Sequence, residues 1–327
     1  MKFSFTSDQQ QFAASLRTML EREFTAAHLR EVWESGTGHD ATLWSRLAEM
    51  GVLAMMLPEV DGGMGGDFVD TILLVEELGR AAVPGPAFET MTAGALALRG
   101  TPWARGVADG SIGVTAALMG ERYVPHTAVA ALVLLADHDT VRALEMSQLR
   151  IDSVEGIDRG RCLATLSGTE TGGHFVGADL GTVTDAGSLA SAAYLLGLSS
   201  RMLAIAGDYA RDRRQFGQPI GSFQAVKHLM ADALLKVEFA RPAVYRAAWS
   251  HATDADTRAR DVSMAKALAS EAAQKAARSA LQVHGAIGYT WECDLQLFMK
   301  KAWALIPAWG GVEYHRRRVS DAVLGPR

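Results

Sequence analysis

Apolar residues recur at helical spacing through the first hundred residues of the chain. A helix N-cap signal at Thr6 to Asp8 precedes the first of these patterns. The apolar positions of the first two helices are Phe12, Leu16, Met19 and Leu20, then Leu43, Trp44, Leu47 and Met50. A further helix is predicted from Asp70 to Leu78, closed by Gly79. This part of the chain therefore predicts amphipathic helices that share one core.

The pattern changes between residues 100 and 180 and then becomes helical again. Short apolar runs at 112–114, 128–135 and 162–166 are separated by Gly, Asp and Thr, which is typical of short strands. Further on, the nearly continuous apolar stretch from Leu189 to Tyr209 predicts a buried helix. The remaining predicted helices span residues 223–249, 262–283, 295–305 and 314–323.

These elements predict a mainly α protein with a small β domain. The expected domains are a helical domain over residues 1–100, a short β domain over 101–182 and a helical bundle over 183–327. A chain of 327 residues can bury a core of this size, and 49% hydrophobic against 21% charged residues excludes a disordered chain.

Composition narrows the class of partner. The net charge of −5 argues against nucleic acid as the main partner. Cys162 and Cys293 form no CxxC or CxxH pair, so we expect no metal site and a reducing, cytoplasmic location. We also expect no membrane span and no signal peptide, because no apolar run reaches about 18–20 residues and the N-terminus lacks an apolar core.

The block from Arg211 to Ile220 carries the most distinctive chemistry. It places several guanidinium groups beside Gln215, Phe216 and a Gly/Pro turn. Arginine binds phosphate with two parallel hydrogen bonds, and an aromatic ring can stack on adenine. The alternative is a solvated basic turn with Phe216 in the core.

A second block, from Gln282 to Glu292, follows a predicted helix with a Gly/Ala-rich turn. Small residues there let a ligand or another chain approach the backbone closely. We interpret His284 as a hydrogen-bonded histidine at the helix end, and an ordinary helix cap remains the alternative for Gly285, Gly288 and Tyr289.

Taken together and in this order, the motifs resemble those of the acyl-CoA dehydrogenase family. The matching segments are Thr6 to Gln10, Leu57 to Gly66, Glu76 to Arg80, Tyr209 to Gln224 with His228 and Asp232, and Gln282 to Tyr289. The resemblance implies a helical N-terminal domain, a middle β domain and a C-terminal four-helix bundle. It also implies FAD and a tetramer built as a dimer of dimers.

The resemblance assigns cofactor-binding roles to particular residues. The positions that match the segment holding the ADP part of FAD, often FAD seated in the neighbouring subunit, are Arg213, Gln215, Phe216 and Gln224. Gln282, Gly285 and Ala286 match a Gln…Gly-Gly turn in which the second Gly is Ala here.

The chain departs from the family at the catalytic base. Counted from Gln282 without gaps, Trp309 stands where family members carry the Glu that removes the α-proton. Losing a positioned general base costs ~10²–10⁴ in rate. Other relatives carry the Glu at a position near Gly187, where Asp185 is the nearby carboxylate but lies two residues out of register. Glu313 matches a structural Glu of the family turn.

The middle domain departs as well. The resemblance implies two flavin-pocket segments, Thr-Glu-Pro…Ala-Gly-Ser-Asp and Trp-Ile/Val-Thr/Ser, and neither occurs between Thr101 and Leu180. We therefore expect a shortened β domain without a complete flavin pocket.

The leading hypothesis is a non-catalytic subunit of a heteromeric α₂β₂ acyl-CoA dehydrogenase. It would complete the FAD site of a homologous catalytic partner that binds most of the acyl-CoA, as in actinobacterial enzymes acting on steroid-derived CoA esters. The alternatives are a self-sufficient homomeric dehydrogenase with a displaced carboxylate such as Asp185, and a FAD-free scaffold subunit.

Overall fold

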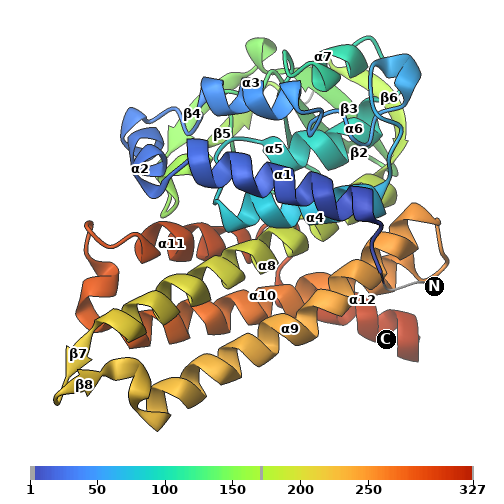
Figure 1. Cartoon of the computed structure of the whole chain (residues 1–327). Coiled ribbons are helices and arrows are strands. Elements are labelled where there is room, and N and C mark those ends of the chain that lie inside the picture. Colours follow the sequence, from blue (N-terminus) through green and yellow to red (C-terminus); the bar gives the residue numbers. More distant parts are fainter. Residues whose placement is uncertain (1–3, 170–171, 326–327) are drawn as a thin grey trace.

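The computed structural model describes residues 4–169 and 172–325, in which helices make up most of the molecule and short strands form small sheets (Figure 1). The N-terminal helices are α1 (Ser7–Glu23), α2 (Ala26–Ser35), α3 (Ala41–Glu49), α4 (Phe68–Arg80), α5 (Ala87–Glu89), α6 (Ala95–Leu98) and α7 (Ala104–Ala108). The helix α1 begins with a capping box, because the Thr6 and Gln9 side chains each bond the backbone N–H of the other.

The strands fall between the two helical parts. They are β1 (Val114–Ala117), β2 (Leu132–Asp137), β3 (Thr140–Glu145), β4 (Arg150–Val154), β5 (Leu163–Ser167) and β6 (His174–Asp179). One sheet has the order β1-β2-β3-β6, in which β1 and β2 are parallel and the other pairs antiparallel. The strands β4 and β5 form a separate antiparallel pair. The predicted small β region is confirmed.

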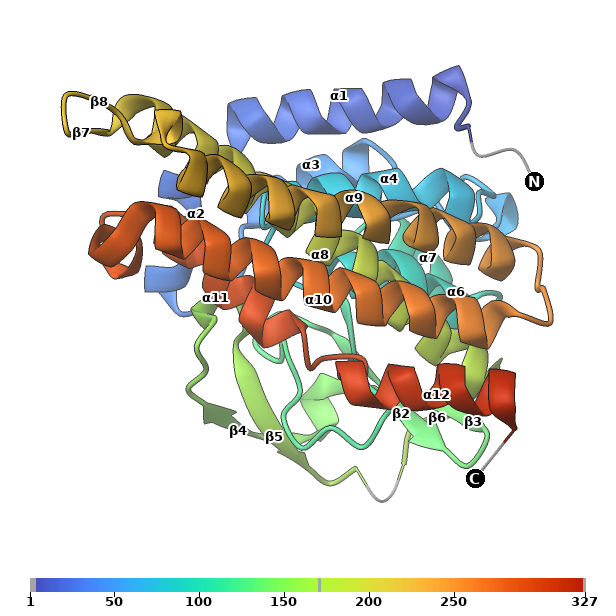
Figure 2. The same ribbon diagram turned by 90° about the horizontal axis from the view of Figure 1, so that it is seen from below.

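The C-terminal part is a helical bundle. It contains α8 (Leu180–Asp212), the hairpin strands β7 (Arg214–Gln215) and β8 (Gln218–Pro219), α9 (Gln224–Ala252), α10 (Arg258–His284), α11 (Leu295–Leu305) and α12 (Val312–Leu324). Figure 2 shows α9 and α10 side by side, with α8 behind them. The helix α8 also packs against α4, so it lies at the centre of the molecule.

Two glycines let α4 and α8 cross almost backbone to backbone. A Cβ built on Gly197 of α8 would lie 2.0 Å from the carbonyl oxygen of Glu76, and one on Gly79 of α4 would lie 2.1 Å from that of Tyr194. No other residue fits at such distances. This crossing joins the N-terminal helices and the bundle into one hydrophobic core.

The helix α8 begins earlier than its apolar pattern predicts, at Leu180 instead of Leu189, with Asp179 as its N-cap. Its early turns contain polar residues that are nonetheless buried, such as Asp185 and Ser188. Contrary to the sequence expectation, α8 is long and apolar enough to span a membrane by length and composition. Since 78% of its most apolar window is buried inside the protein, we interpret it as the core helix of the bundle.

Candidate cofactor-binding site

The Arg-rich block forms a two-residue hairpin at one end of the bundle. In β7 and β8, Gln215 pairs with Gln218, and the turn between them is Phe216-Gly217. Both turn residues have positive φ, +52° and +80°, as a type I′ turn requires. Asn and Gly are the usual residues at such positions, so a phenylalanine there is costly.

Phe216 is 91% exposed, so the alternative that placed its ring in the core is wrong. Its contact with another ring is edge-on, with 6.1 Å between the centroids of Phe216 and Phe223. A bulky residue with positive φ and no packing role carries backbone strain of about 1–3 kcal/mol. The exposed ring and the backbone strain together make this turn a candidate binding feature.

The second predicted segment lies at the same end of the bundle (Figure 1). The ring of His284, the last residue of α10, stacks on Tyr209 near the end of α8 with centroids 4.3 Å apart. His284 is buried, and its Nδ1 donates to the Ala280 carbonyl at 2.8 Å, which agrees with a structural helix-end role. Burial lowers the pKa of His284.

Gly285 ends α10 with φ +67° and ψ −147°, a conformation that essentially only glycine adopts. A Cβ built on it would meet nothing within 4 Å, so its outer side is open. Gln282 and Ala286 are exposed beside it. The backbone of this turn is therefore exposed, and a ligand or another chain could approach it closely.

Positive charge surrounds this end of the molecule. Arg213 and Arg214 are exposed, and the described residues provide neither with an ion-pair partner. The helix α9 starts at exposed Gln224 with no side-chain cap, which leaves first-turn N–H groups for an anion. Guanidinium groups, helix amides and an exposed ring together suit a ligand that joins phosphate to a planar base.

Trp309, which the sequence comparison with the family matched to the catalytic base, is buried against the helix α8. Trp309 is 6% exposed, and its ring lies on Gly187, where a Cβ would come within 2.2 Å of a ring carbon. Its carbonyl oxygen accepts from Ser188 Oγ at 3.1 Å and His315 Nε2 at 2.8 Å. Burial lowers the pKa of His315 to about 4, so the imidazole is neutral. The two residues that we matched to family base positions are thus in contact, and the indole fills the space beside Gly187.

Asp185, the displaced carboxylate, is 1% exposed and held in two ion pairs. Its Oδ1 lies 2.8 Å from Arg318 Nη1 and its Oδ2 lies 3.3 Å from Arg258 Nε. A buried carboxylate engaged by two guanidinium groups has no free face for a substrate proton. The geometry favours a structural role.

A groove of about 560 Å³ runs beside the start of α8 and the start of α12. One of its carboxylates, Asp179, accepts from the Thr182 backbone N–H at 2.7 Å and from its hydroxyl. Both bonds lower the pKa of Asp179, which makes it a weaker base. Thr184, Tyr314 and Arg318 also line the groove.

The structure also contains a buried polar cluster that the sequence did not predict. Burial raises the pKa of Glu89 to about 7, and Glu89 Oε1 lies 3.7 Å from His126 Nε2. Nearby, Lys301 Nζ pairs with Asp158 at 3.5 Å. Within the described residues, Glu89 Oε2 and His126 Nδ1 lack hydrogen-bond partners, and the cavity of about 10 Å³ between these groups admits one water at most. Because these residues lie far apart in sequence, no local motif announces the cluster.

Comparison with known proteins identifies the class. Residues 6–105 match the family model of the acyl-CoA dehydrogenase N-terminal domain, and residues 182–324 match that of the C-terminal domain. These matches flank the strands β1 to β6, all of which lie between residues 105 and 182. The chain belongs to the acyl-CoA dehydrogenase family, whose members are FAD-dependent oxidoreductases.

Individual proteins similar to this chain narrow the comparison within the family. The acyl-CoA dehydrogenase IpdE2 of Mycolicibacterium smegmatis is 33% identical over 314 residues, which cover 95% of this chain and 97% of that one. Among solved structures, a variant of the Tcur3481–Tcur3483 steroid acyl-CoA dehydrogenase superposes with a TM-score of 0.88 at 26% identity, covering 97% of this chain and 98% of that one. The ChsE4–ChsE5 complex of Mycobacterium tuberculosis gives 0.88 at 25% identity with full coverage of both chains.

Proposed function

We propose that this chain is the non-catalytic subunit of a heteromeric acyl-CoA dehydrogenase that desaturates a steroid-derived CoA thioester. In this proposal it completes the FAD site of a homologous catalytic subunit in an α₂β₂ assembly. One contrast carries the proposal: the exposed, strained Phe216 hairpin is suited to a cofactor, whereas an indole fills the position of the base.

The hairpin end fits the ADP part of FAD. Arg213 would bind the pyrophosphate, the Phe216 ring would stack on the adenine, and Gln215 and Gln224 would bond ribose or base edges. Gln282, Gly285 and Ala286 would let the cofactor approach the backbone. When bound, FAD supplies the two-electron oxidising power for the desaturation.

The region around Trp309 does not suit the flavin ring and a catalytic base in the way that the hairpin suits the ADP part. Trp309 lies against Gly187 where a carboxylate would have to stand, and Asp185 is engaged by two arginines. This supports a partner that supplies the base and the flavin-ring pocket, and it disfavours the self-sufficient alternative. The near-equal lengths of this chain and IpdE2 agree with a shortened β domain as a shared trait.

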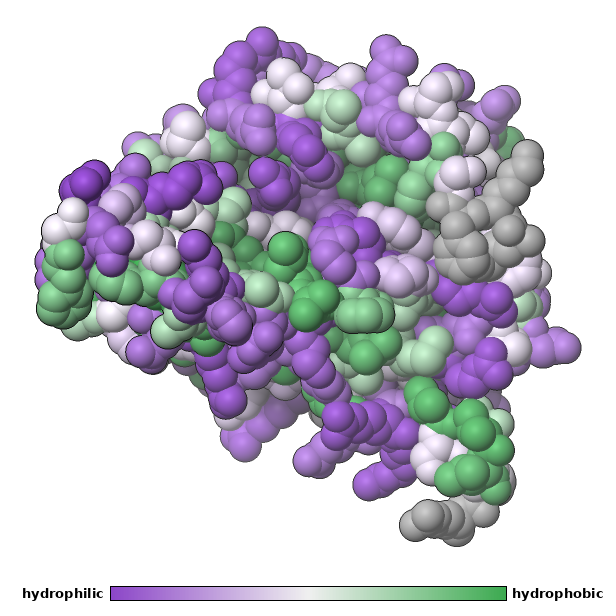
Figure 3. Space-filling view, turned by 60° about the horizontal axis from the view of Figure 1, so that its bottom comes forward, coloured by the Kyte–Doolittle hydropathy of each residue, from purple (hydrophilic) through white to green (hydrophobic). Residues whose placement is uncertain are grey.

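An apolar face on the bundle supports a protein partner. On α9 and α10, exposed apolar side chains form the surface that we call the bundle face: Leu234, Leu235, Phe239, Met264 and Leu268. Figure 3 shows a group of hydrophobic residues near the middle of this side of the molecule, among hydrophilic ones. Exposed apolar patches of this kind mark protein–protein contacts. The likeness to the Tcur3481–Tcur3483 steroid acyl-CoA dehydrogenase and to the ChsE4–ChsE5 complex supports the steroid and two-chain parts of the proposal.

The test is co-expression with a catalytic acyl-CoA dehydrogenase chain, followed by measurement of flavin and subunit ratio. We expect one FAD per pair of different chains and a colourless chain when it is purified alone. Arg213→Ala should weaken flavin retention by about tenfold or more, because a charged phosphate contact contributes ~1.5–3 kcal/mol.

The matched control is Arg105→Ala, which removes an exposed arginine of α7 remote from the hairpin. Unchanged flavin content in the Arg213→Ala complex would favour the FAD-free scaffold. A yellow, active chain without any partner would favour the self-sufficient enzyme.

A further inference from the structure

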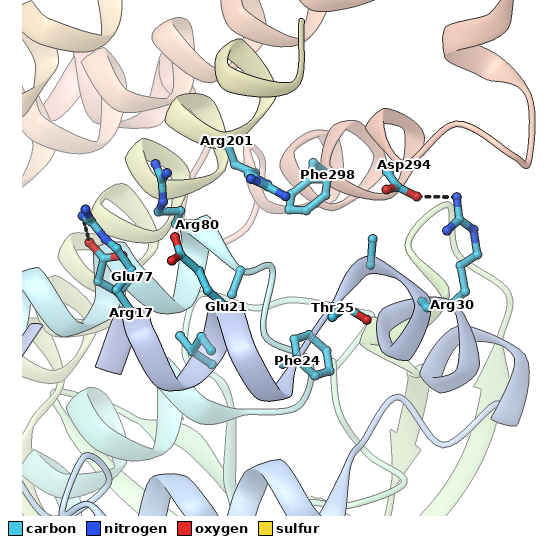
Figure 4. A pocket seen from close by; sticks show the side chains of 14 residues that line it. Arg17, Glu21, Phe24, Thr25, Arg30, Glu77, Arg80, Arg201, Asp294 and Phe298 are labelled. Atoms are coloured by element: carbon cyan, nitrogen blue, oxygen red, sulfur yellow. Dashed lines mark hydrogen bonds and ion pairs between the residues drawn. The ribbon is translucent and has the colours of Figure 1, made fainter. Parts of the chain in front are cut away.

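A cavity of about 430 Å³ lies between α1, α2, α4, α8 and α11 (Figure 4). It shares no lining residue with the hairpin, with the turn after α10 or with the groove beside α12. Its volume is within the range of small-molecule sites. The proposed FAD site leaves this cavity unexplained.

Two of its four arginines are already neutralised by acids. Arg17 Nε donates to Glu77 Oε2 at 2.8 Å, and a second nitrogen of Arg17 bonds the other carboxylate oxygen of Glu77. Arg30 pairs with Asp294 at 2.6 Å and also donates to the Trp291 carbonyl oxygen. These pairs form part of the wall and offer little to a ligand.

The other two arginines, Arg80 of α4 and Arg201 of α8, line the cavity without an ion pair or hydrogen bond in the part of the chain that the structure describes. Both are partly buried. The Arg201 guanidinium lies 5.8 Å from the ring centroid of Phe298, which holds it in place. Figure 4 shows Arg80, Arg201 and Phe298 along one wall, opposite Glu21 and Phe24 of the α1 side.

The rest of the wall combines apolar side chains with a helix N-terminus. Leu20, Phe24 and Phe298, which are 2%, 5% and 3% exposed, add narrow strips of apolar surface. Thr25 and Ala26, where α2 begins, also line the cavity, so first-turn amides of a ten-residue helix add positive potential. An apolar wall beside two unpaired guanidinium groups suits an amphipathic anion.

Charge balance indicates how many negative charges the ligand carries. Four arginines line the cavity together with three acids, Glu21, Glu77 and Asp294, which leaves one positive charge. A single carboxylate neutralises it and matches the planar fork of a guanidinium. Glu21, which has no ion pair with another described residue, repels any such ligand and limits its affinity.

We propose that this cavity is a binding site for an amphipathic monocarboxylate. The carboxylate lies between Arg80 and Arg201, and the apolar body lies on Leu20, Phe24 and Phe298. The site belongs to this chain alone and does not depend on the proposed FAD role. Its test can therefore fail while that role stands, and the reverse also holds.

Isothermal titration of the full-length chain with octanoate at low salt tests the proposal. Octanol carries the same apolar body without charge, and inorganic phosphate carries charge without the body. We expect one octanoate per chain, with octanol and phosphate at least about tenfold weaker. Arg80→Gln and Arg201→Gln should each weaken octanoate about tenfold or more. Glu21→Gln should tighten it about fivefold, a gain that a merely structural role would not give.

Arg105→Gln is the matched control and should leave octanoate binding unchanged, with circular dichroism confirming that every variant folds. Equal affinities for octanoate and octanol would overturn the proposal, as would several octanoates per chain or wild-type affinity in both arginine variants. Absence of octanoate binding up to millimolar concentration overturns it too. If the arginine variants then also lose a co-expressed partner chain, the cavity is a protein contact instead.

Discussion

Placing a methyl group at Gly187 should destabilise the protein only while Trp309 is present. In the native chain a Cβ on Gly187 would lie 2.2, 2.3 and 2.4 Å from three carbons of the indole, whereas carbon atoms in contact stand about 3.5–4.0 Å apart. The ring cannot easily move away, because the side chain is buried and the backbone carbonyl oxygen of Trp309 accepts hydrogen bonds from Ser188 and His315.

The expected energies predict that the effect of Gly187→Ala on the free energy of unfolding changes sign when Trp309 is removed. Gly187→Ala should lower the free energy of unfolding by about 1–3 kcal/mol through overpacking. Trp309→Ala should lower it by about 3–5 kcal/mol through the cavity it leaves. In the Trp309→Ala background the new methyl group enters that cavity, and alanine is the better helix former by ~1 kcal/mol, so Gly187→Ala should become stabilising. The coupling between the two sites is then about 2–4 kcal/mol.

Urea unfolding of the four proteins, followed by circular dichroism, measures this cycle. The control is Gly207→Ala on the same helix, where the nearest atom to a new Cβ is the end of Arg211 at 3.8 Å. That change should stabilise the chain slightly in both backgrounds. An equal loss from Gly187→Ala with and without Trp309 would refute the view that the indole occupies the space above this glycine.

Three further outcomes are expected. Trp309→Glu purified alone should show no acyl-CoA-dependent reduction of an electron acceptor, and turnover would mean that the chain holds the reactive end of the cofactor itself. Phe239→Glu on the bundle face should abolish co-purification with the partner, whereas Val60→Glu, at a position equally exposed in the N-terminal part, should not; two unaffected pull-downs would rule out that face. Glu89→Gln should stabilise the protein by up to about 3 kcal/mol at pH 8 and very little near pH 4.5, as measured by urea midpoints. The raised pKa of about 7 means that stability is lost as pH rises from 4.5 through 7, so a pH-independent effect would contradict the assignment.

Periodicity predicted the helices well where their apolar residues face the core. It failed at the first turns of α8, because Asp185 is buried by pairing with Arg258 and Arg318, residues more than seventy positions away in sequence. A local pattern cannot show such a partner, so the apolar run that predicts this helix begins only at Leu189.

In the candidate site, too, features made by neighbouring residues could be predicted and features made by distant residues could not. The turn that carries Arg213 and Phe216 could be predicted, since contiguous residues form it, and its role in cofactor binding stays a prediction. The contact between Gly187 and Trp309 could be guessed only as two separate departures from the family. The cavity around Arg80 and Arg201 draws on separate helices, and no sequence motif predicts it.

The length of α8 separates two of the features that matter most here. Gly187 and Arg213 lie 26 residues apart, near opposite ends of the helix, which corresponds to about 40 Å at 1.5 Å per residue. A substitution under the indole therefore has no direct route to the hairpin, and a change in the hairpin leaves the indole undisturbed. One end of such a helix could lose its chemistry by mutation while the other continued to be selected. The length of α8 thus keeps substitutions at its two ends independent of each other, as the proposed non-catalytic subunit requires.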